Sequence, residues 1–244
     1  MITQKTYLKN IKHLTSFIID LILPMECLGC GVSGVWLCEN CFKQIPFNQS
    51  FPCLVCHRPT LQGATHKECR SETSLDGILI ASWQTELLKD LVHSFKYENL
   101  KILAPQLAEI ISRKVDNSPL LANLFLSEQT LLIPVPLFKA RKWDRGYNQA
   151  ELLAYELARF SPVQLASQAV KRIRNTTTQT DLPRLKRLKN IQNAFEVVVL
   201  EEIKNRSIIL VDDVTTTGAT ISELARVLKT AGAKEVWGLV LTRG

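Results

Sequence analysis

The feature that most constrains the fold is the stretch 207–220, which reads SIILVDDVTTTGAT. It begins with an uninterrupted apolar run, as expected of a strand buried on both faces of a parallel sheet. The run ends on Asp212 and Asp213, where open α/β sheets bind ligands. Apolar residues then recur at helical spacing, so we expect a helix from about Gly218 to Gly232. The stretch therefore predicts an α/β sheet with a polar site at its edge.

The turn between this strand and helix has the composition of a phosphate-binding loop. A helix N-terminus supplies amide N–H donors and partial positive charge, and Gly218 is expected to let the backbone approach a ligand closely. The carboxylates of Asp212 and Asp213 suit the vicinal hydroxyls of a ribose, directly or through a magnesium ion. A plain strand and helix joined by a polar turn is the alternative. The predicted loop consists of Thr215, Thr216, Thr217, Gly218, Ala219 and Thr220.

These pieces, in this order, resemble the phosphoribosyl-pyrophosphate (PRPP) motif of type I phosphoribosyltransferases. The motif has a hydrophobic strand, Asp-Asp, three residues and then Thr-Gly-x-Thr. The resemblance implies that Asp212 and Asp213 are the catalytic pair, which would hold the ribose hydroxyls with magnesium. It also implies that the threonine-rich loop holds the 5′-phosphate of PRPP or a related phosphoribosyl ligand.

A second loop with ligand-binding chemistry follows the apolar segment LLIPVP at 131–136. Arg141, Arg145 and the Gly146 amide suit a pyrophosphate, because guanidinium groups bind phosphate oxygens in a bidentate manner. The basic, hydroxyl-rich segment 172–195 has the composition of a mobile flap over a ligand. A solvated loop is the alternative for that segment.

The seven cysteines are spaced as metal ligands. Two residues between ligands let both sulfurs turn toward one ion, and zinc takes four ligands in a tetrahedron. We expect one or two structural zinc ions rather than disulfides. The second site is the weaker one, because His57 competes with His66 as its ligand. The first predicted set is Cys27, Cys30, Cys38 and Cys41, and the second is Cys53, Cys56, His66 and Cys69.

The chain of 244 residues is long enough for a full α/β domain and a smaller one. We expect an N-terminal helix at 1–24, a zinc-binding domain at 25–72 and a phosphoribosyltransferase-like domain at 73–244. Strands that alternate with helices imply parallel pairing. The predicted strands are 77–83, 131–136, 197–200, 208–211 and 236–241, the predicted helices 86–97, 101–115 and 150–159, and the segment 117–129 is predicted to be irregular.

The net charge of +7 is concentrated in one region. Residues 139–189 contain twelve lysines and arginines against four acidic residues. This surplus suits the phosphates of a nucleotide, a nucleic acid or both.

The segment 9–24 has an apolar helical stripe beside lysines, which suits packing on the protein itself or peripheral attachment to an anionic membrane. Asp20 interrupts its apolar run and no cleavage site follows, so we expect a cytoplasmic protein, or one at the inner face of the membrane.

The full set of motifs resembles the ComF family of competence and GntX-like proteins. The resemblance rests on the cysteine pairs, LIPVP, RGYNQ at 145–149, Arg172-x-Arg and the stretch that contains Asp212, and it spans about Pro24 to Arg243. His66 departs from the family, many members of which have a fourth cysteine pair. The resemblance implies a zinc module fused to a phosphoribosyltransferase-type domain. For the competence branch it also implies handling of incoming single-stranded DNA with other competence proteins.

Three functions remain open at this point. The first is DNA handling in natural transformation by a protein with a PRPP-type binding site. The second is phosphoribosyl transfer in salvage or cofactor metabolism, although no segment indicates an acceptor pocket. The third is a regulator that senses PRPP.

Overall fold

The computed structural model describes residues 25–176 and 190–244. The chain forms two compact units, which meet between Ile45 and Pro46 in the sequence and are described separately. The predicted N-terminal helix at 1–24 and the central part of the predicted flap, 177–189, lie outside the described residues. Within the described ranges, no helix is long and apolar enough to span a bilayer.

The smaller unit is built around the first cysteine cluster. Its helix α2 (Glu39–Gln44) is capped by Cys38, whose Sγ accepts a hydrogen bond from the backbone N–H of Cys41. Within its described part, residues 25–45, the buried apolar residues other than two cysteines are Leu37, Phe42 and Ile45. So few apolar side chains stabilise a fold poorly, and ligation of a metal would supply much of the missing free energy.

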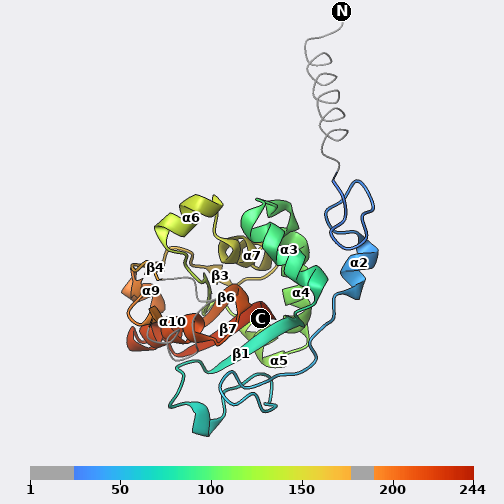
Figure 1. Ribbon diagram of the computed structural model, residues 1–244. Helices are drawn as coiled ribbons and strands as arrows, with labels where there is room; N and C mark the ends of the chain where they lie inside the picture. The colour runs from blue at the N-terminus through green and yellow to red at the C-terminus, as the bar shows by residue number, and fades with distance from the viewer. Residues whose placement is uncertain (1–24, 177–189) are drawn as a thin grey trace, which may run out of the picture. The chain divides into compact units, whose positions relative to one another are not determined.

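The larger unit contains a five-stranded sheet, which confirms the predicted α/β class (Figure 1). Every paired strand is parallel to its neighbour, in the order β1-β7-β6-β2-β3. The apolar run of β6 is fully buried, as expected at the centre of such a sheet. The strands are β1 (Gly77–Trp83), β2 (Thr130–Pro134), β3 (Gln164–Leu165), β6 (Ser207–Thr215) and β7 (Glu235–Arg243).

Helices cover the sheet on both sides. Helices α4 and α7 contact one face, and α10 packs on the other through the apolar residues Ile221, Leu224 and Leu228. The helices are α3 (Glu86–Tyr97), α4 (Ala104–Asp116), α5 (Pro119–Phe125), α6 (Lys139–Arg145), α7 (Gln149–Ala158), α9 (Leu200–Ile203) and α10 (Ala219–Thr230), with 3-10 turns η1 (Lys67–Cys69) and η2 (Lys101–Leu103).

Three sequence predictions of secondary structure are wrong. The strand predicted at 197–200 does not join the parallel sheet, because β5 (Phe195–Val197) pairs antiparallel with β4 (Val170–Arg172) and Leu200 begins α9. The segment predicted as irregular contains α5, which has a Ser118 N-cap and a proline in its first turn. The predicted arginine loop is the short helix α6.

The second cysteine cluster belongs to the same compact unit as the sheet. The division after Ile45 therefore differs from the predicted domain boundary near residue 72. A reason for this is that Leu54 and Leu75 are buried in the core that α10 shares with the sheet. The cysteine-rich segment contributes apolar side chains to the sheet domain instead of forming a separate core.

Lys114 is fully buried in the larger unit. Its ammonium donates hydrogen bonds to the carbonyls of Asn48 and Ser50, at 2.6 and 2.8 Å, and lies 3.6 Å from the ring centroid of Phe51. This side chain on α4 therefore holds the segment that leads from the larger unit's first residue into the second cysteine cluster.

We predict that Lys114→Met lowers the free energy of unfolding of the larger unit by about 2 kcal/mol, because the buried carbonyl of Asn48 and the partly buried carbonyl of Ser50 lose their charged donor. The matched control is Arg113→Met on the same helix, where the exposed side chain pairs with Glu109. Thermal melts of the full chain should show a lower Tm for Lys114→Met alone, and equal melting of the two variants would contradict the role of Lys114.

Candidate functional site

The site is built on the carboxyl end of β6. The strand continues to Thr215, so Asp212 and Asp213 lie within its last part and not beyond it. The side chain of Asp213 is buried, and its Oδ1 accepts a hydrogen bond from the backbone N–H of Val214 at 2.6 Å. The Asp212 side chain accepts one from the backbone N–H of Asp213 at 2.9 Å. Backbone N–H groups thus hold both carboxylates near the carboxyl end of β6.

The charge of this acidic pair is partly balanced by a lysine from another element. Lys96, near the end of α3, places Nζ 3.0 Å from Asp213 Oδ1. Burial, reinforced by the neighbouring Asp213, raises the pKa of Asp212 to about 7, and Lys96 opposes that rise. The carboxyl of Asp212 is therefore poised to lose its proton when a cation or a hydroxyl-bearing ligand arrives.

The residue next to Lys96 connects the carboxylates to the predicted pyrophosphate-binding arginines. Tyr97 Oη lies 3.3 Å from a guanidinium nitrogen of Arg145, and the guanidinium carbon lies 5.0 Å from the Tyr97 ring centroid. Lys96 and Tyr97 are not among the site residues that the sequence predicts. Their only sequence signal is a basic-aromatic pair at the end of a helix, outside its apolar stripe.

The described start of the predicted flap lies next to α6. Arg141 donates a hydrogen bond to the backbone carbonyl of Thr176, and Arg172 donates one to the Thr176 hydroxyl. Burial lowers the pKa of Arg172 to about 10, and the positive charge of Arg141 acts in the same direction. The Nε of Arg172 is buried and has no hydrogen-bond partner among the residues that the structure describes. Gly146 ends α6 in the left-handed conformation, with φ of 76°.

The loop 215–220 connects β6 to α10. Gly218 is the N-cap of α10 and, at φ 75°, has the left-handed backbone that favours glycine. A Cβ at this position would lie 2.6 Å from both Cδ atoms of Leu54. The sequence predicts that Gly218 lets the backbone approach a ligand closely. In the structure, the group that lies close to Gly218 is the side chain of Leu54. Thr215 accepts a hydrogen bond at its carbonyl from Gly244 N at 3.0 Å.

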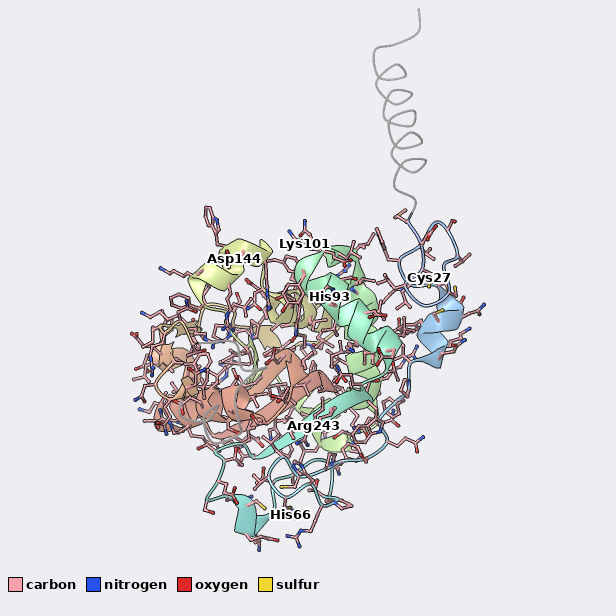
Figure 2. All side chains as sticks on the ribbon, in the orientation of Figure 1. Cys27, His66, His93, Lys101, Asp144 and Arg243 are labelled. Carbon is pink, nitrogen blue, oxygen red and sulfur yellow. The ribbon has the colours of Figure 1, made fainter. Side chains whose placement is uncertain are left out.

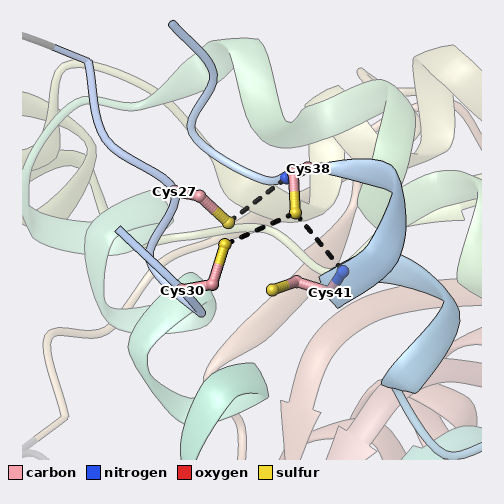
Figure 3. A group of neighbouring side chains, drawn as sticks. All are labelled: Cys27, Cys30, Cys38 and Cys41. Atoms are coloured by element: carbon pink, nitrogen blue, oxygen red, sulfur yellow. Dashed lines mark hydrogen bonds between the residues drawn. The ribbon is translucent and has the colours of Figure 1, made fainter. Parts of the chain in front are cut away.

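The first cysteine set converges, as Figure 3 shows. Its four sulfurs lie within 4.8 Å of one another, and the Cys30 and Cys38 sulfurs are 3.7 Å apart. A tetrahedral ion with metal–sulfur bonds of about 2.3 Å requires sulfurs about 3.8 Å apart, so this donor set fits a structural metal ion. Burial alone would raise the pKa of Cys27, but hydrogen bonds from backbone N–H groups, that of Cys38 first, lower it to about 6.

The second set also converges, with His66 as its fourth member. Cys56 Sγ lies 3.2 Å from His66 Nδ1, and a hydrogen bond from Arg58 lowers the pKa of the Cys56 thiol to about 6. His57, the competing ligand, instead faces the Arg243 guanidinium, with nitrogen separations of 3.0 and 3.3 Å. The donors of both clusters therefore suit structural metal ions.

Comparisons with known proteins place the chain in a family. It is 38% identical over 224 residues to Competence protein F of Haemophilus influenzae, covering 88% of this chain and 96% of that protein. The chain belongs to the ComF family. Another relative in the family is Competence protein ComFC of Bacillus subtilis, 28% identical over 204 residues, with 80% of this chain and 79% of that protein aligned.

A shorter match reaches DNA utilization protein YhgH of Escherichia coli K12. The two chains are 35% identical over 157 residues, with 64% of this chain and 67% of that protein aligned.

The sheet domain of this ComF-family protein resembles phosphoribosyltransferases. The family model for the phosphoribosyl transferase domain matches residues 144–243, a range that contains β6, the loop 215–220 and α10. Among solved structures, the allosteric regulatory enzyme of purine biosynthesis aligns with 57% of this chain and 25% of its own. The sequence identity of this alignment is 17% and its TM-score is 0.35.

We predict that the purified protein carries about two bound metal ions, because each cluster supplies four ligands. Cys30→Ser and Cys56→Ser should each remove about one ion, and Cys30→Ser,Cys56→Ser should remove both. Elemental analysis after gel filtration without chelator measures the content. A single ion that is lost in only one of the two variants would show that the other cluster holds no metal.

Proposed function

We propose that this protein acts in natural transformation, where it handles incoming single-stranded DNA in the cytoplasm and binds PRPP or a related phosphoribosyl ligand. The observation that carries the proposal is similarity to Competence protein F along 96% of that protein, together with a complete PRPP-type stretch at β6 and α10. Zinc is the metal we propose for the cysteine clusters, and other competence proteins are the partners that such a role requires.

Each part of a phosphoribosyl ligand has a matching group in the site. Asp212 and Asp213 suit the ribose hydroxyls, which donate hydrogen bonds to carboxylates. The loop 215–220 offers backbone amides and hydroxyls to a 5′-phosphate at the start of the twelve-residue helix α10. Arg145 extends from α6 on the side of Tyr97 and suits the pyrophosphate group. Magnesium, bound with PRPP, would neutralise phosphate charge beside the two carboxylates.

Phosphoribosyl transfer to an unknown acceptor, in salvage or cofactor metabolism, is the second candidate function. The intact acidic pair and the arginines of α6 favour it, because they suit the ribose and the departing pyrophosphate. The two candidates share the PRPP site and differ in whether an acceptor reacts and whether the protein binds DNA.

We predict that magnesium and PRPP raise the Tm of the wild-type protein, because a ligand at 100 times its Kd stabilises the folded state by about 2.7 kcal/mol. The double variant Asp212→Asn,Asp213→Asn should lose this response while remaining folded. The matched control is Asp144→Asn, since Asp144 is exposed on α6 (labelled in Figure 2). An unchanged wild-type Tm at saturating PRPP would refute the ligand.

The same site should make binding depend on pH. The ionised form of Asp212 accepts hydrogen bonds from the ligand, and burial raises its pKa from 3.8 to about 7. Affinity for magnesium and PRPP should therefore increase as the pH rises from about 6 to about 8. Without ligand, a raised carboxyl pKa costs stability above the unfolded pKa, so Asp212→Asn should raise the Tm at pH 8 more than at pH 5. Calorimetric titrations and melts measure both effects.

The DNA-binding surface that we propose is centred on α6. Lys139 and Lys142 line two adjoining hollows of about 420 and 600 Å³, and the first is also lined by Lys171 and Arg172. Trp143, 88% exposed, lines the second. An exposed aromatic beside basic side chains suits a base and its phosphate. Tyr147 follows α6 and is the other aromatic residue of the stretch 139–149. It is buried and donates a hydrogen bond from its hydroxyl to the Phe95 carbonyl, so it does not offer a stacking face.

We predict that Trp143→Ala weakens binding of single-stranded oligothymidine about tenfold, because stacking contributes about 1–3 kcal/mol per base. The matched control is Phe160→Ala, an equally exposed aromatic (86%) that lies outside α6. Lys139→Ala,Lys142→Ala should reduce the dependence of affinity on salt, since phosphate contacts release counterions. Fluorescence anisotropy at several salt concentrations measures both.

A transformation assay separates the two candidate functions. In a naturally transformable host, strains with Trp143→Ala or the double aspartate variant should transform less often than one with Phe160→Ala. Normal transformation in both strains, with no DNA affinity in the wild-type protein, would favour metabolic phosphoribosyl transfer. In that case, release of pyrophosphate with a panel of acceptors becomes the deciding measurement.

A further inference from the structure

The second cysteine cluster contacts the candidate phosphate loop through one of the two residues that lie between its ligands Cys53 and Cys56. Leu54 lies between Cys53 and Cys56 and is 3% exposed. It belongs to the core that includes Ala219 and Ile221 of α10. Its two methyl groups lie so close to Gly218 that a Cβ there would overlap them, at 2.6 Å. The side of Gly218 that a Cβ would occupy is therefore filled by the metal-ligand turn.

Two further contacts connect the same segment to the loop. His57, next to Cys56, faces Arg243, which lies beside Thr215 in the sheet register (His66 and Arg243 are labelled in Figure 2). After Cys69, the hydroxyl of Thr73 lies 2.9 Å from the hydroxyl of Ser222 in the first turn of α10. The cysteine-rich segment thus contacts the end of β7 beside the loop, the loop itself and the helix after it.

Among the described residues, few contacts besides those of the ligand set join the two ligand-bearing turns, 53–58 and 66–69, to each other. The turn at 53–58 has backbone hydrogen bonds of its own, from Cys53 N to Arg58 O at 2.9 Å and from His57 N to Cys53 O at 3.0 Å. Its side-chain contacts with 66–69 are Cys56 with His66 and the exposed pair of Arg58 with Glu68. A surface ion pair contributes little stability, whereas a metal ion joins all four ligands.

We propose that the second cluster, when it holds its metal, positions the phosphate loop through Leu54, so that affinity for a phosphoribosyl ligand depends on metal at this cluster and not at the first. Leu54 is a positioning residue, because its side chain packs against Gly218 of the loop and would act on the ligand only through that loop. The proposal rests on the phosphoribosyl ligand proposed above. It assigns different roles to two clusters with similar donors: the first belongs to the other compact unit, and the second to the sheet domain.

The coupling between metal and ligand must be reciprocal. Metal at Cys53, Cys56, His66 and Cys69 raises affinity for the ligand, so bound ligand must slow or oppose loss of that metal. Reagents that remove the metal or oxidise its thiolates would therefore reduce phosphoribosyl binding without touching the ligand-binding residues. This dependence would make the site responsive to the supply of metal or to oxidation.

The test compares variants of the full chain in their affinity for PRPP with magnesium, measured by calorimetry. Cys56→Ser and Leu54→Ala are expected to bind about tenfold more weakly, within the usual range of coupling between sites. The controls are Cys30→Ser in the first cluster, Leu61→Ala at an 82% exposed leucine of the same segment, and the volume-conserving Leu54→Met. These controls should stay within about twofold of wild type.

A second readout follows the loop and the metal directly. Hydrogen–deuterium exchange should increase at 215–221 in Cys56→Ser and Leu54→Ala, while exchange in β2 and α4 stays unchanged and shows that the domain is folded. Leu54→Ala should retain its metal, as elemental analysis would verify. Saturating PRPP should slow transfer of one metal ion per chain to a chromogenic chelator, and that ion should be the one missing in Cys56→Ser.

The outcomes distinguish this inference from the proposed function. If wild type binds PRPP and both Leu54→Ala and Cys56→Ser bind it equally well, the positioning role is refuted and the ligand stands. Equal weakening in Cys30→Ser would also refute it, since the effect would not be specific to the second cluster. If wild type does not bind PRPP, the proposed ligand fails. Unchanged exchange at 215–221 in Leu54→Ala would then refute the positioning role independently.

Discussion

The arrangement of the site depends on one constraint, which is that two acidic residues lie in the last part of a strand whose apolar run is buried on both faces. An isolated carboxylate in such a setting is costly because burial removes its hydration. Lys96 compensates Asp213 through a 3.0 Å ion pair, while Asp212 keeps a pKa near neutrality. The carboxyl end of β6 therefore holds two acidic groups, of which Asp213 has a cationic partner and Asp212 is only partly compensated. Such a site sacrifices stability for binding, as functional sites often do.

The rest of the larger unit supports this end of β6 from different directions. Helix α3 supplies both the lysine that pairs with Asp213 and the tyrosine that contacts Arg145, so a single helix end connects the acidic pair to α6. Thr176 accepts hydrogen bonds from Arg141 and Arg172, which brings two basic side chains together despite their repulsion. Concentrated positive charge of this kind is stable only where polar acceptors or an anion offset it.

The two proposed roles, in competence and in phosphoribosyl binding, are compatible with each other in this geometry. The PRPP-type stretch occupies the end of β6, whereas the exposed Trp143 and its neighbouring lysines lie on α6. Ligand and DNA would thus use different side chains of the same basic region. A fold that resembles an enzyme does not by itself establish catalysis, because function depends on the groups that line the site. Phosphoribosyl transfer would also require a pocket for the acceptor, and none of the residues that we assign to the ligand forms one.

The sequence by itself determined the α/β class, the central buried strand and the two cysteine sets, because each follows from local periodicity or ligand spacing. Local sequence patterns did not predict contacts between residues that lie far apart in the sequence. Val198–Leu200 have the apolar character of a strand, yet β5 ends before them in a separate hairpin sheet. Only the tertiary structure decided that His66 and not His57 completes the second cluster, that Lys96 neutralises Asp213, and that Gly218 faces Leu54. These contacts join residues between 10 and 164 positions apart, and a sequence pattern with a period of two or four residues carries no information about such distances.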